Sequence, residues 1–242
     1  MRKLILHMMT TMDGFIADSE GKLSGWTNWD EEMKDFYNDE VFAASDTIMY
    51  GRRIYEEMVP AWTAIADRHP HHGETPTEGD VAFGKRVRDM KKIVVSTTLE
   101  HAGRNAILIR DNIAERIIEL KMQTDSDILL YCGPRLVSTL TELGSIDEYM
   151  LYVNPIVLGQ GTNLFGNLKG TLQLKLLKTK IFGSGVVLKY YQPIYTKSTR
   201  RPPKPGRDGN PRRSAAVQLR FAADGLHPKL KPDTLGRLLI AI

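Results

Sequence analysis

Short apolar runs alternate with amphipathic stretches along residues 1–195. A run of about four to eight apolar residues bounded by turn residues predicts a buried strand, and apolar positions at helical spacing predict a helix. Strands are predicted at residues 3–9, 47–50, 92–96, 106–109, 128–131, 147–153, 172–182 and 186–192. Helices are predicted at residues 30–44, 54–61, 81–90, 113–123 and 135–143.

The order of these elements predicts an α/β fold. Strands and helices in alternation are typical of a mostly parallel central sheet with helices on both faces, which is a three-layer α/β/α arrangement. The last two predicted strands are separated only by Gly183-Ser184-Gly185, which is typical of a hairpin. The sheet is therefore expected to end in an antiparallel pair.

Composition separates a basic C-terminal segment from the rest of the chain. Residues 196–242 contain 11 Lys and Arg, 3 Asp and Glu, and six of the 12 prolines. The whole chain has 33 basic and 29 acidic residues, so residues 1–195 contain 22 basic and 26 acidic residues. This part of the chain is therefore mildly acidic. We expect residues 1–195 to form one domain and residues 196–242 to be a disordered or non-native tail. Binding of nucleic acid by the tail is the alternative, but Phe221 is its only aromatic residue for stacking on bases.

Two observations restrict the class of protein. No apolar run approaches the ~18 residues that a membrane-spanning helix needs, and the short run at residues 4–6 favours a first strand over a signal peptide. Cys132 is the only cysteine, so the chain can form no internal disulfide. We therefore expect a cytoplasmic protein that does not bind membranes.

Two predicted strands run through a glycine directly into a predicted helix. The strand at residues 128–131 is followed by Cys132-Gly133-Pro134-Arg135-Leu136, and the strand at residues 47–50 is followed by Gly51-Arg52-Arg53. The N–H groups at a helix start and the helix dipole favour an anion, and arginine binds phosphate through a planar fork of donors. Both turns are candidate phosphate sites, and turns that bind nothing are the alternative.

Hydroxyl residues end a third predicted strand. Ser96 and Thr97 lie at the end of the strand predicted at residues 92–96, where their hydroxyls can bind phosphate or cap a turn. Ligands of open α/β sheets bind beyond the carboxyl ends of the strands, which is where all three segments are expected. Their agreement favours a single nucleotide-binding site.

Five segments also form a recognisable set. They are Thr11–Ala17, Ser45–Tyr55, Lys92–Ser96, Gly144–Tyr149 and Asn154–Phe165. In this order, over about residues 2–193, the chain resembles the dihydrofolate reductase superfamily, and the last two segments are similar to the reductase domain of bacterial riboflavin biosynthesis proteins and its stand-alone relatives. The resemblance implies a dihydrofolate reductase-like fold, a homodimer, and NADPH-dependent hydride transfer to a small heterocycle.

The resemblance also implies the residues that bind NADPH. Arg52 is expected at the 2′-phosphate, with Arg53 and Gly51 beside it. The family usually has two glycines where this chain has Cys132-Gly133, so the cysteine Cβ is expected to crowd the pyrophosphate. The other implied residues are Ser96 and Thr97 on the adenosine side, Cys132, Gly133, Pro134, Arg135 and Leu136 at the pyrophosphate, and Ile16 and Ala17 beside the nicotinamide.

Asp13 and Asp35 are the candidate catalytic acids. The cofactor supplies the hydride, so the protein needs only to orient the reactants and to provide a proton. Asp13 follows the first strand, and Asp35 precedes Gly51 by sixteen residues, the spacing at which folate reductases carry their pocket acid. The alternatives are a turn residue for Asp13 and a solvated helix face for Asp35.

Several other segments have two interpretations. His69-Pro70-His71-His72 suggests a metal, but the prolines and glycines around it argue against fixed ligand geometry, so no metal site is predicted. The Gly159–Gly161 loop can contact substrate or form a tight turn. Trp26, Trp29 and Trp62 can line a substrate pocket or pack in the core.

The reaction itself leaves alternatives open. The resemblance implies reduction of 5-amino-6-(5-phosphoribosylamino)uracil in riboflavin biosynthesis, or dihydrofolate reductase activity. Hypotheses from other classes are a non-catalytic nucleotide-binding dimer and a nucleic-acid binder that acts through its tail.

Overall fold

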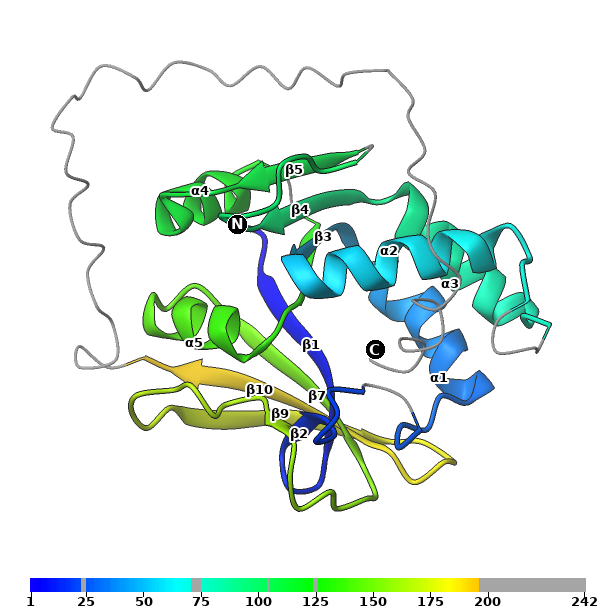
Figure 1. Ribbon diagram of the computed structural model, residues 1–242. Coiled ribbons are helices and arrows are strands. Elements are labelled where there is room, and N and C mark those ends of the chain that lie inside the picture. The colour runs from blue at the N-terminus through cyan, green and yellow to red at the C-terminus, as the bar shows by residue number, and fades with distance from the viewer. Residues whose placement is uncertain (23–24, 71–74, 104, 124–125, 196–242) are drawn as a thin grey trace, which may run out of the picture.

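An eight-stranded sheet runs through the part of the protein that the structure describes (Figure 1). The structure is a computed structural model and describes residues 1–22, 25–70, 75–103, 105–123 and 126–195. The strands are β1 (Leu4–Thr11), β3 (Ser45–Gly51), β4 (Lys91–Val95), β5 (Ala106–Ile109), β6 (Asp127–Tyr131), β7 (Glu148–Asn154), β9 (Gln173–Ile181) and β10 (Val187–Ile194). Their order is β5-β4-β3-β6-β1-β7-β10-β9, in which the first six are parallel and the last two antiparallel to their neighbours.

Helices cover both faces of this sheet (Figure 1). One face carries α1 (Glu31–Phe36), the π-helical turn η1 (Tyr37–Val41), α2 (Arg52–Ala66) and α3 (Glu78–Asp89). The other face carries α4 (Ile113–Lys121) and α5 (Pro134–Glu142). The prediction of a three-layer α/β/α fold with a mostly parallel sheet and an antiparallel C-terminal hairpin is confirmed.

Burial on both faces explains the continuous apolar runs of the central strands. All eight residues of β1 are buried, as are the last four of β6. A parallel strand between two helical layers has no polar face, so its sequence does not alternate. The edge strand β9 differs, because seven of its nine residues are exposed and three are lysines, which discourage pairing with a further strand.

Two short strands were not predicted. β2 (Phe15–Ala17) pairs with β8 (Thr162–Asn163) in a separate two-stranded sheet. Segments of three and two residues are too short to show a period of two, so the sequence gives no signal for them. The pair nevertheless fixes the loop after β1 against the loop after β7.

Three predicted helices differ from the structure in detail. The helix predicted at residues 30–44 is α1 followed by η1, in which the Phe42 N–H donates to the Tyr37 carbonyl at 2.9 Å. The helix predicted at residues 54–61 continues past Pro60 to Ala66. α3 begins earlier than predicted, at Glu78, after a capping box between Thr77 and Asp80.

Some predictions fall outside the described residues. They are the basic tail, residues 196–242, and the histidines at positions 71 and 72. Within the described ranges, no helix is both long enough and apolar enough to cross a membrane.

Candidate active site

α2 and α5 begin side by side at the carboxyl edge of the sheet. Their preceding strands β3 and β6 are neighbours, and Tyr50 pairs with Tyr131 just before the two turns. The N-cap residues are Gly51 and Gly133, which have no side chain to cap the free N–H groups, and neither first turn contains an acidic residue. By contrast, the Thr77 side chain caps α3. Two adjacent uncapped helix starts favour binding of an anion between them.

Cys132 directly follows β6 and lies next to Gly51 of the neighbouring turn. Its side chain is fully buried, and burial raises the pKa of its thiol. A Cβ placed on Gly51 would lie 3.4 Å from the Cys132 Cβ, whereas a Cβ on Gly133 would meet nothing within 4 Å. The cysteine therefore packs toward Gly51, and the backbone of Gly133 faces open space. That Cys132 crowds a pyrophosphate stays a prediction.

Three arginines stand in the first turns of these helices. Arg52, Arg53 and Arg135 are exposed. Arg52 lies 3.4 Å from the carboxylate of Glu56, and Arg53 lies 3.1 Å from that of Glu57. Arg53 also donates to the Gly21 carbonyl at 3.2 Å. Exposed ion pairs of this kind are weak, so a phosphate can compete for the guanidinium groups.

Ser96 caps a turn. Its side chain is buried, and its Oγ accepts hydrogen bonds from the Thr98 and Leu99 N–H groups at 3.1 and 3.0 Å. Thr97 is exposed beside it. The geometry favours the turn-cap interpretation of Ser96, and contact of either residue with adenosine stays a prediction.

The predicted nicotinamide segment is packed against the Gly159–Gly161 loop. Ile16 and Ala17 are buried in β2. Gly161 has φ +139°, and a Cβ there would lie 2.1 Å from the Ala17 carbonyl oxygen. Only glycine fits this position, so the loop is at least a close-packed turn.

Asp13 connects two loops. Its carboxylate accepts hydrogen bonds from the Thr11 hydroxyl at 2.5 Å and from the Leu158 and Gly159 N–H groups at 3.3 and 2.8 Å. The Thr11 hydroxyl and these N–H groups lower the pKa of Asp13. A carboxylate held ionised by such contacts is a poor proton donor. This geometry favours the turn interpretation, and catalysis by Asp13 stays a prediction.

Asp35 lies on the outer side of α1. It is exposed, while the neighbouring Lys34 and Phe36 are buried. Its position favours the solvated helix face. Among the residues described in the structure, the buried polar and charged side chains include no aspartate or glutamate.

The family of the chain follows from comparison with known proteins. The family model of the RibD C-terminal domain matches residues 2–188. The chain belongs to this family. It is 37% identical over 188 residues to the uncharacterized protein YyaP of Bacillus subtilis (strain 168), covering 77% of this chain and 92% of YyaP.

Two solved structures share the fold of this RibD-family chain. A proposed riboflavin biosynthesis protein from Shewanella sp. PV-4 has a TM-score of 0.58 at 20% identity, with 81% of this chain and all of the other covered. Dihydrofolate reductase from Enterococcus faecalis, complexed with NADP(H), has a TM-score of 0.50 at 11% identity, with 79% and 96% covered. The fold is that of dihydrofolate reductase, and membership of the RibD C-terminal domain family supports a reductase role.

This RibD-family chain contains a row of polar rings that the sequence did not reveal. Tyr50, Tyr131, His7 and Tyr152 lie on the adjacent strands β3, β6, β1 and β7, and we call them the polar row. Tyr50 and Tyr131 directly precede the two glycine turns, and a tyrosine at the end of each apolar run is the only signal that could have drawn attention to them.

The three tryptophans differ in their surroundings. Trp62 is buried and lies 4.3 Å from Phe83 between ring centroids, so it is a core residue. Trp29 is partly buried and packs edge-on against Tyr37 at 5.2 Å. Trp26 is buried, and neither its indole N–H nor that of Trp29 has a hydrogen-bond partner in the described part of the chain.

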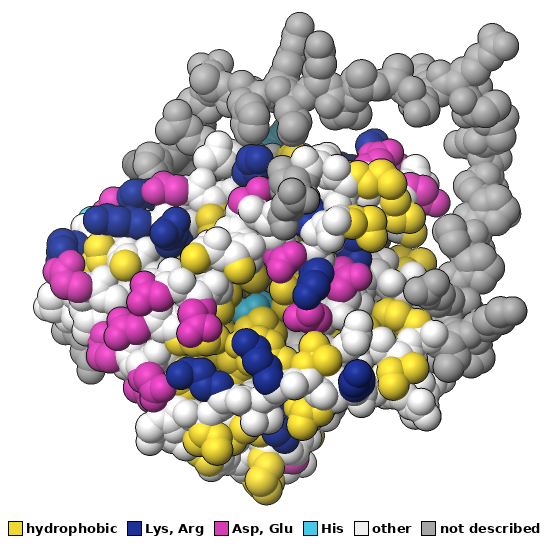
Figure 2. Space-filling model, turned by 180° about the vertical axis from the view of Figure 1, so that it is seen from behind, with side chains coloured by type: hydrophobic (Ala, Val, Ile, Leu, Met, Phe, Trp, Pro, Cys, Tyr) yellow, Lys and Arg dark blue, Asp and Glu magenta, His cyan; other side chains and the backbone are white. Residues whose placement is uncertain are grey.

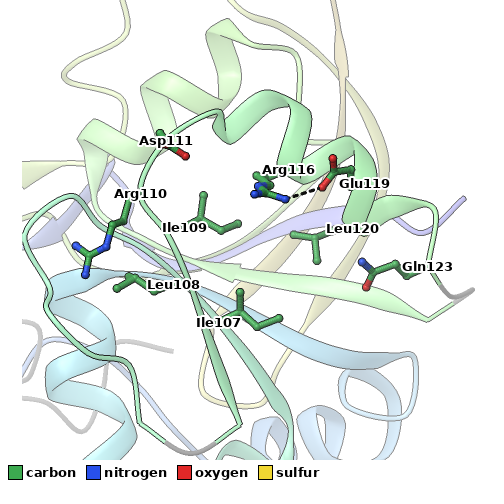
Figure 3. A pocket seen from close by; sticks show the side chains of 9 residues that line it. All are labelled: Ile107, Leu108, Ile109, Arg110, Asp111, Arg116, Glu119, Leu120 and Gln123. Carbon is green, nitrogen blue, oxygen red and sulfur yellow. Dashed lines mark hydrogen bonds and ion pairs between the residues drawn. The ribbon is translucent and has the colours of Figure 1, made fainter. Parts of the chain in front are cut away.

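Two hollows lie away from the carboxyl-edge turns. One of about 340 Å³ lies between β5 and α4, where Arg116 and Glu119 pair at 3.1 Å (Figure 3). Another of about 250 Å³ lies where η1 meets the sheet and is lined by His7, Glu40 and Lys178, among others. Figure 2 shows a hollow near the centre of the rear face, with apolar and histidine side chains inside it. Neither hollow is lined by a residue predicted to bind NADPH.

No metal site stands out. His69 is exposed. The described residues contain no cluster of three or more histidine, cysteine, aspartate or glutamate side chains that could hold a metal ion.

Proposed function

We propose that this protein is an NADPH-dependent reductase that transfers hydride to a small heterocyclic substrate. The observation that carries the proposal is the pair of uncapped helix starts at Gly51 and Gly133, on neighbouring strands of a dihydrofolate reductase fold. Three exposed arginines beside them supply positive charge. This arrangement fits a ligand with more than one phosphate better than a single anion.

Each part of the edge suits a different part of the cofactor. Arg52 and Arg53 would hold the 2′-phosphate, and the residues from Gly133 to Leu136 would hold the pyrophosphate. Gly133 suits this role because its α-carbon faces open space, so a phosphate can approach the backbone closely. Ile16 and Ala17 would pack beside the nicotinamide, and Ser96 and Thr97 beside the adenosine.

NADPH, when bound, supplies the hydride, and the chain supplies orientation and an environment without bulk water. A reduced ring also needs a proton. Since Asp13 is held by three donors and Asp35 is exposed, we expect a water molecule or a neutral hydroxyl to be the proton source rather than a buried acid.

Membership of the family supports two hypotheses for the substrate. Reduction of 5-amino-6-(5-phosphoribosylamino)uracil is one hypothesis, and dihydrofolate reductase activity is the alternative. A cytoplasmic location and a homodimer belong to the proposal; the single cysteine of the chain supports the first, and the resemblance alone supports the second.

Titration of the full chain with NADPH tests the proposal. Tryptophan or cofactor fluorescence should change and saturate at micromolar cofactor. A screen of NADPH oxidation against pterins, folates and aminopyrimidines then identifies the substrate. The absence of any saturable response to NADPH would refute the proposal.

A further inference from the structure

The hollow of about 250 Å³ lies between the sheet and η1, and we call it the η1 hollow. Its floor is the face of the sheet that α1 covers. Ile5 pairs with Leu129 of β6 and with Glu148 of β7. His7, two residues later, pairs with Met150. Because the side chains of paired residues point to the same face of a sheet, these three strands present one continuous surface to the hollow.

The interior of the η1 hollow is lined by buried apolar side chains from two sides. Four of them are at most 7% exposed, namely Phe36 and Val41 in the roof and Leu129 and Met150 in the floor. Walls of this kind suit a flat apolar ring, which buries a large area at a small cost in conformational entropy. The Met150 side chain is unbranched, so it can adapt its conformation to a ligand.

His7 brings an unpartnered polar atom to this apolar interior. Its side chain is fully buried, and its Nε2 has no hydrogen-bond partner in the described part of the chain. The His7 Nδ1 lies 3.5 Å from the hydroxyl of Tyr37, which does not line the hollow. Nε2 is therefore the ring nitrogen that remains for a ligand. Since an unpaired buried polar atom is costly, a ligand that pairs with Nε2 gains affinity.

The protonation state of His7 restricts the group that can pair with it. Burial lowers the pKa of His7 to about 3, so the imidazole is neutral. A neutral imidazole has one N–H and one acceptor nitrogen, and the tautomer decides which of them is Nε2. A hydroxyl group both donates and accepts, so it pairs with either tautomer. A carboxylate or an ammonium group would pair with only one tautomer and would have to be buried as a charge.

The charges at the rim of the η1 hollow balance. Glu40 and Lys178 are exposed and Glu148 is partly exposed, so the charged lining residues lie at the opening. Glu148 is paired with Lys3 at 2.5 Å, which leaves one charge of each sign. The Lys178 ammonium group lies 4.2 Å from the centroid of the Tyr190 ring. A balanced rim attracts neither anions nor cations, and it therefore favours a neutral ligand.

We propose that the η1 hollow is a second binding site, which takes a neutral monocyclic phenol. The ring would lie between Phe36 and the sheet, with its hydroxyl group on the His7 Nε2. Ile5, Ser45 and Glu148 line the hollow and are within the first two residues of their strands. The hollow thus lies toward the amino ends of the parallel strands, whereas the proposed cofactor site is at their carboxyl ends. This inference goes beyond the proposed function and does not rest on it.

A matched pair of probes tests the class of ligand. p-Cresol and p-xylene have the same shape, and the first has a hydroxyl group where the second has a methyl group. Each is titrated into the full chain by ligand-detected NMR, first without NADPH and then with it. We expect p-cresol to bind with a Kd of about 1 mM or below, and p-xylene to bind at least about fivefold more weakly for want of one hydrogen bond. Saturating NADPH should leave both dissociation constants unchanged.

His7→Phe tests the hydrogen bond within the hollow. It should weaken p-cresol binding about fivefold without weakening p-xylene binding, so that the preference for the hydroxyl group is lost. The melting temperature shows whether the variant is folded.

Ala44→Trp tests the location and changes no buried residue, because Ala44 is an exposed residue of the rim. The new indole should fill the opening and weaken the binding of both probes at least about tenfold. Ala43→Trp is the matched control, since Ala43 is exposed beside Ala44 but does not line the hollow. Both affinities should stay at their wild-type values in this control.

Equal affinities of the two probes for the wild type, wild-type affinities in Ala44→Trp, or loss of p-cresol binding in saturating NADPH would overturn this inference. So would the lack of any saturable binding of p-cresol, which would leave the His7 Nε2 to water alone. These results are distinct from a failure of the proposed function, which would appear as absent NADPH binding in a titration without either probe.

Discussion

Gly133→Asp separates stability from cofactor binding at the start of α5. Gly133 has φ −76° and ψ 172°, which any L-residue adopts, and a Cβ there meets nothing within 4 Å. Aspartate is a good N-cap and interacts favourably with the helix dipole, so the free energy of unfolding should rise by about 0.5–1 kcal/mol. The melting temperature should therefore rise by about 1–4 °C.

The same carboxylate should repel NADPH. Two like charges about 4 Å apart repel by roughly 1 kcal/mol in water and roughly 4 kcal/mol near a protein surface, so affinity should fall about five- to several hundredfold. Fluorescence titration measures the affinity, and thermal unfolding measures the stability. Gly133→Asn is the control, since it caps the helix without a charge. Wild-type affinity in Gly133→Asp, or an equal loss in Gly133→Asn, would refute the electrostatic reasoning.

Three further predictions concern one close-packed glycine and two buried side chains. Gly161→Ala should lower the free energy of unfolding by roughly 2 kcal/mol or more, because φ is +139° and the new Cβ would meet the Ala17 carbonyl. Urea unfolding measures this, and Gly170→Ala, with open space around the new Cβ, is the control. Equal stabilities of the two variants would contradict the close packing at Gly161. Cys132 should react with a thiol reagent only after unfolding, since burial raises the pKa of its thiol; rapid reaction of the native protein would show an open site. Burial lowers the pKa of His7 from 6.5 to about 3. Between these pH values the unfolded chain binds a proton at His7 that the folded chain does not bind. The free energy of unfolding should therefore fall as the pH falls below 6.5, by about 1.4 kcal/mol per pH unit. Unfolding of His7→Phe across this range should show a flatter slope than the wild type, and an identical slope would contradict the assignment.

The fold was predictable because its central strands are long apolar runs. The strand at residues 128–131 is buried between helices on both faces, so its sequence is apolar throughout and marks it clearly. β2 and β8 were not predictable because they have only three and two residues, and their pairing depends on segments that lie far apart in the chain.

The candidate site was predictable only in part. Glycine turns after strands predicted the two helix starts at Gly51 and Gly133, because this geometry is local. The contacts of Asp13 were not predictable, because two of its donors are N–H groups about 145 residues later in the chain. The polar row was missed because a tyrosine in a buried strand reads as a core residue, and only the order and register of the strands bring the four rings together.

The central claim is that the two helix starts and Arg52 bind the phosphates of NADPH. Its most direct test is the ratio of the NADH dissociation constant to the NADPH dissociation constant, measured for the wild type, Arg52→Ala and Arg116→Ala. Arg116→Ala is the control, because Arg116 is an exposed arginine of α4 that, like Arg52, forms an ion pair within its helix (Figure 3). The account predicts tighter NADPH binding by the wild type, a ratio near one for Arg52→Ala, and a wild-type ratio for Arg116→Ala. Equal losses of NADH and NADPH affinity in Arg52→Ala would contradict it.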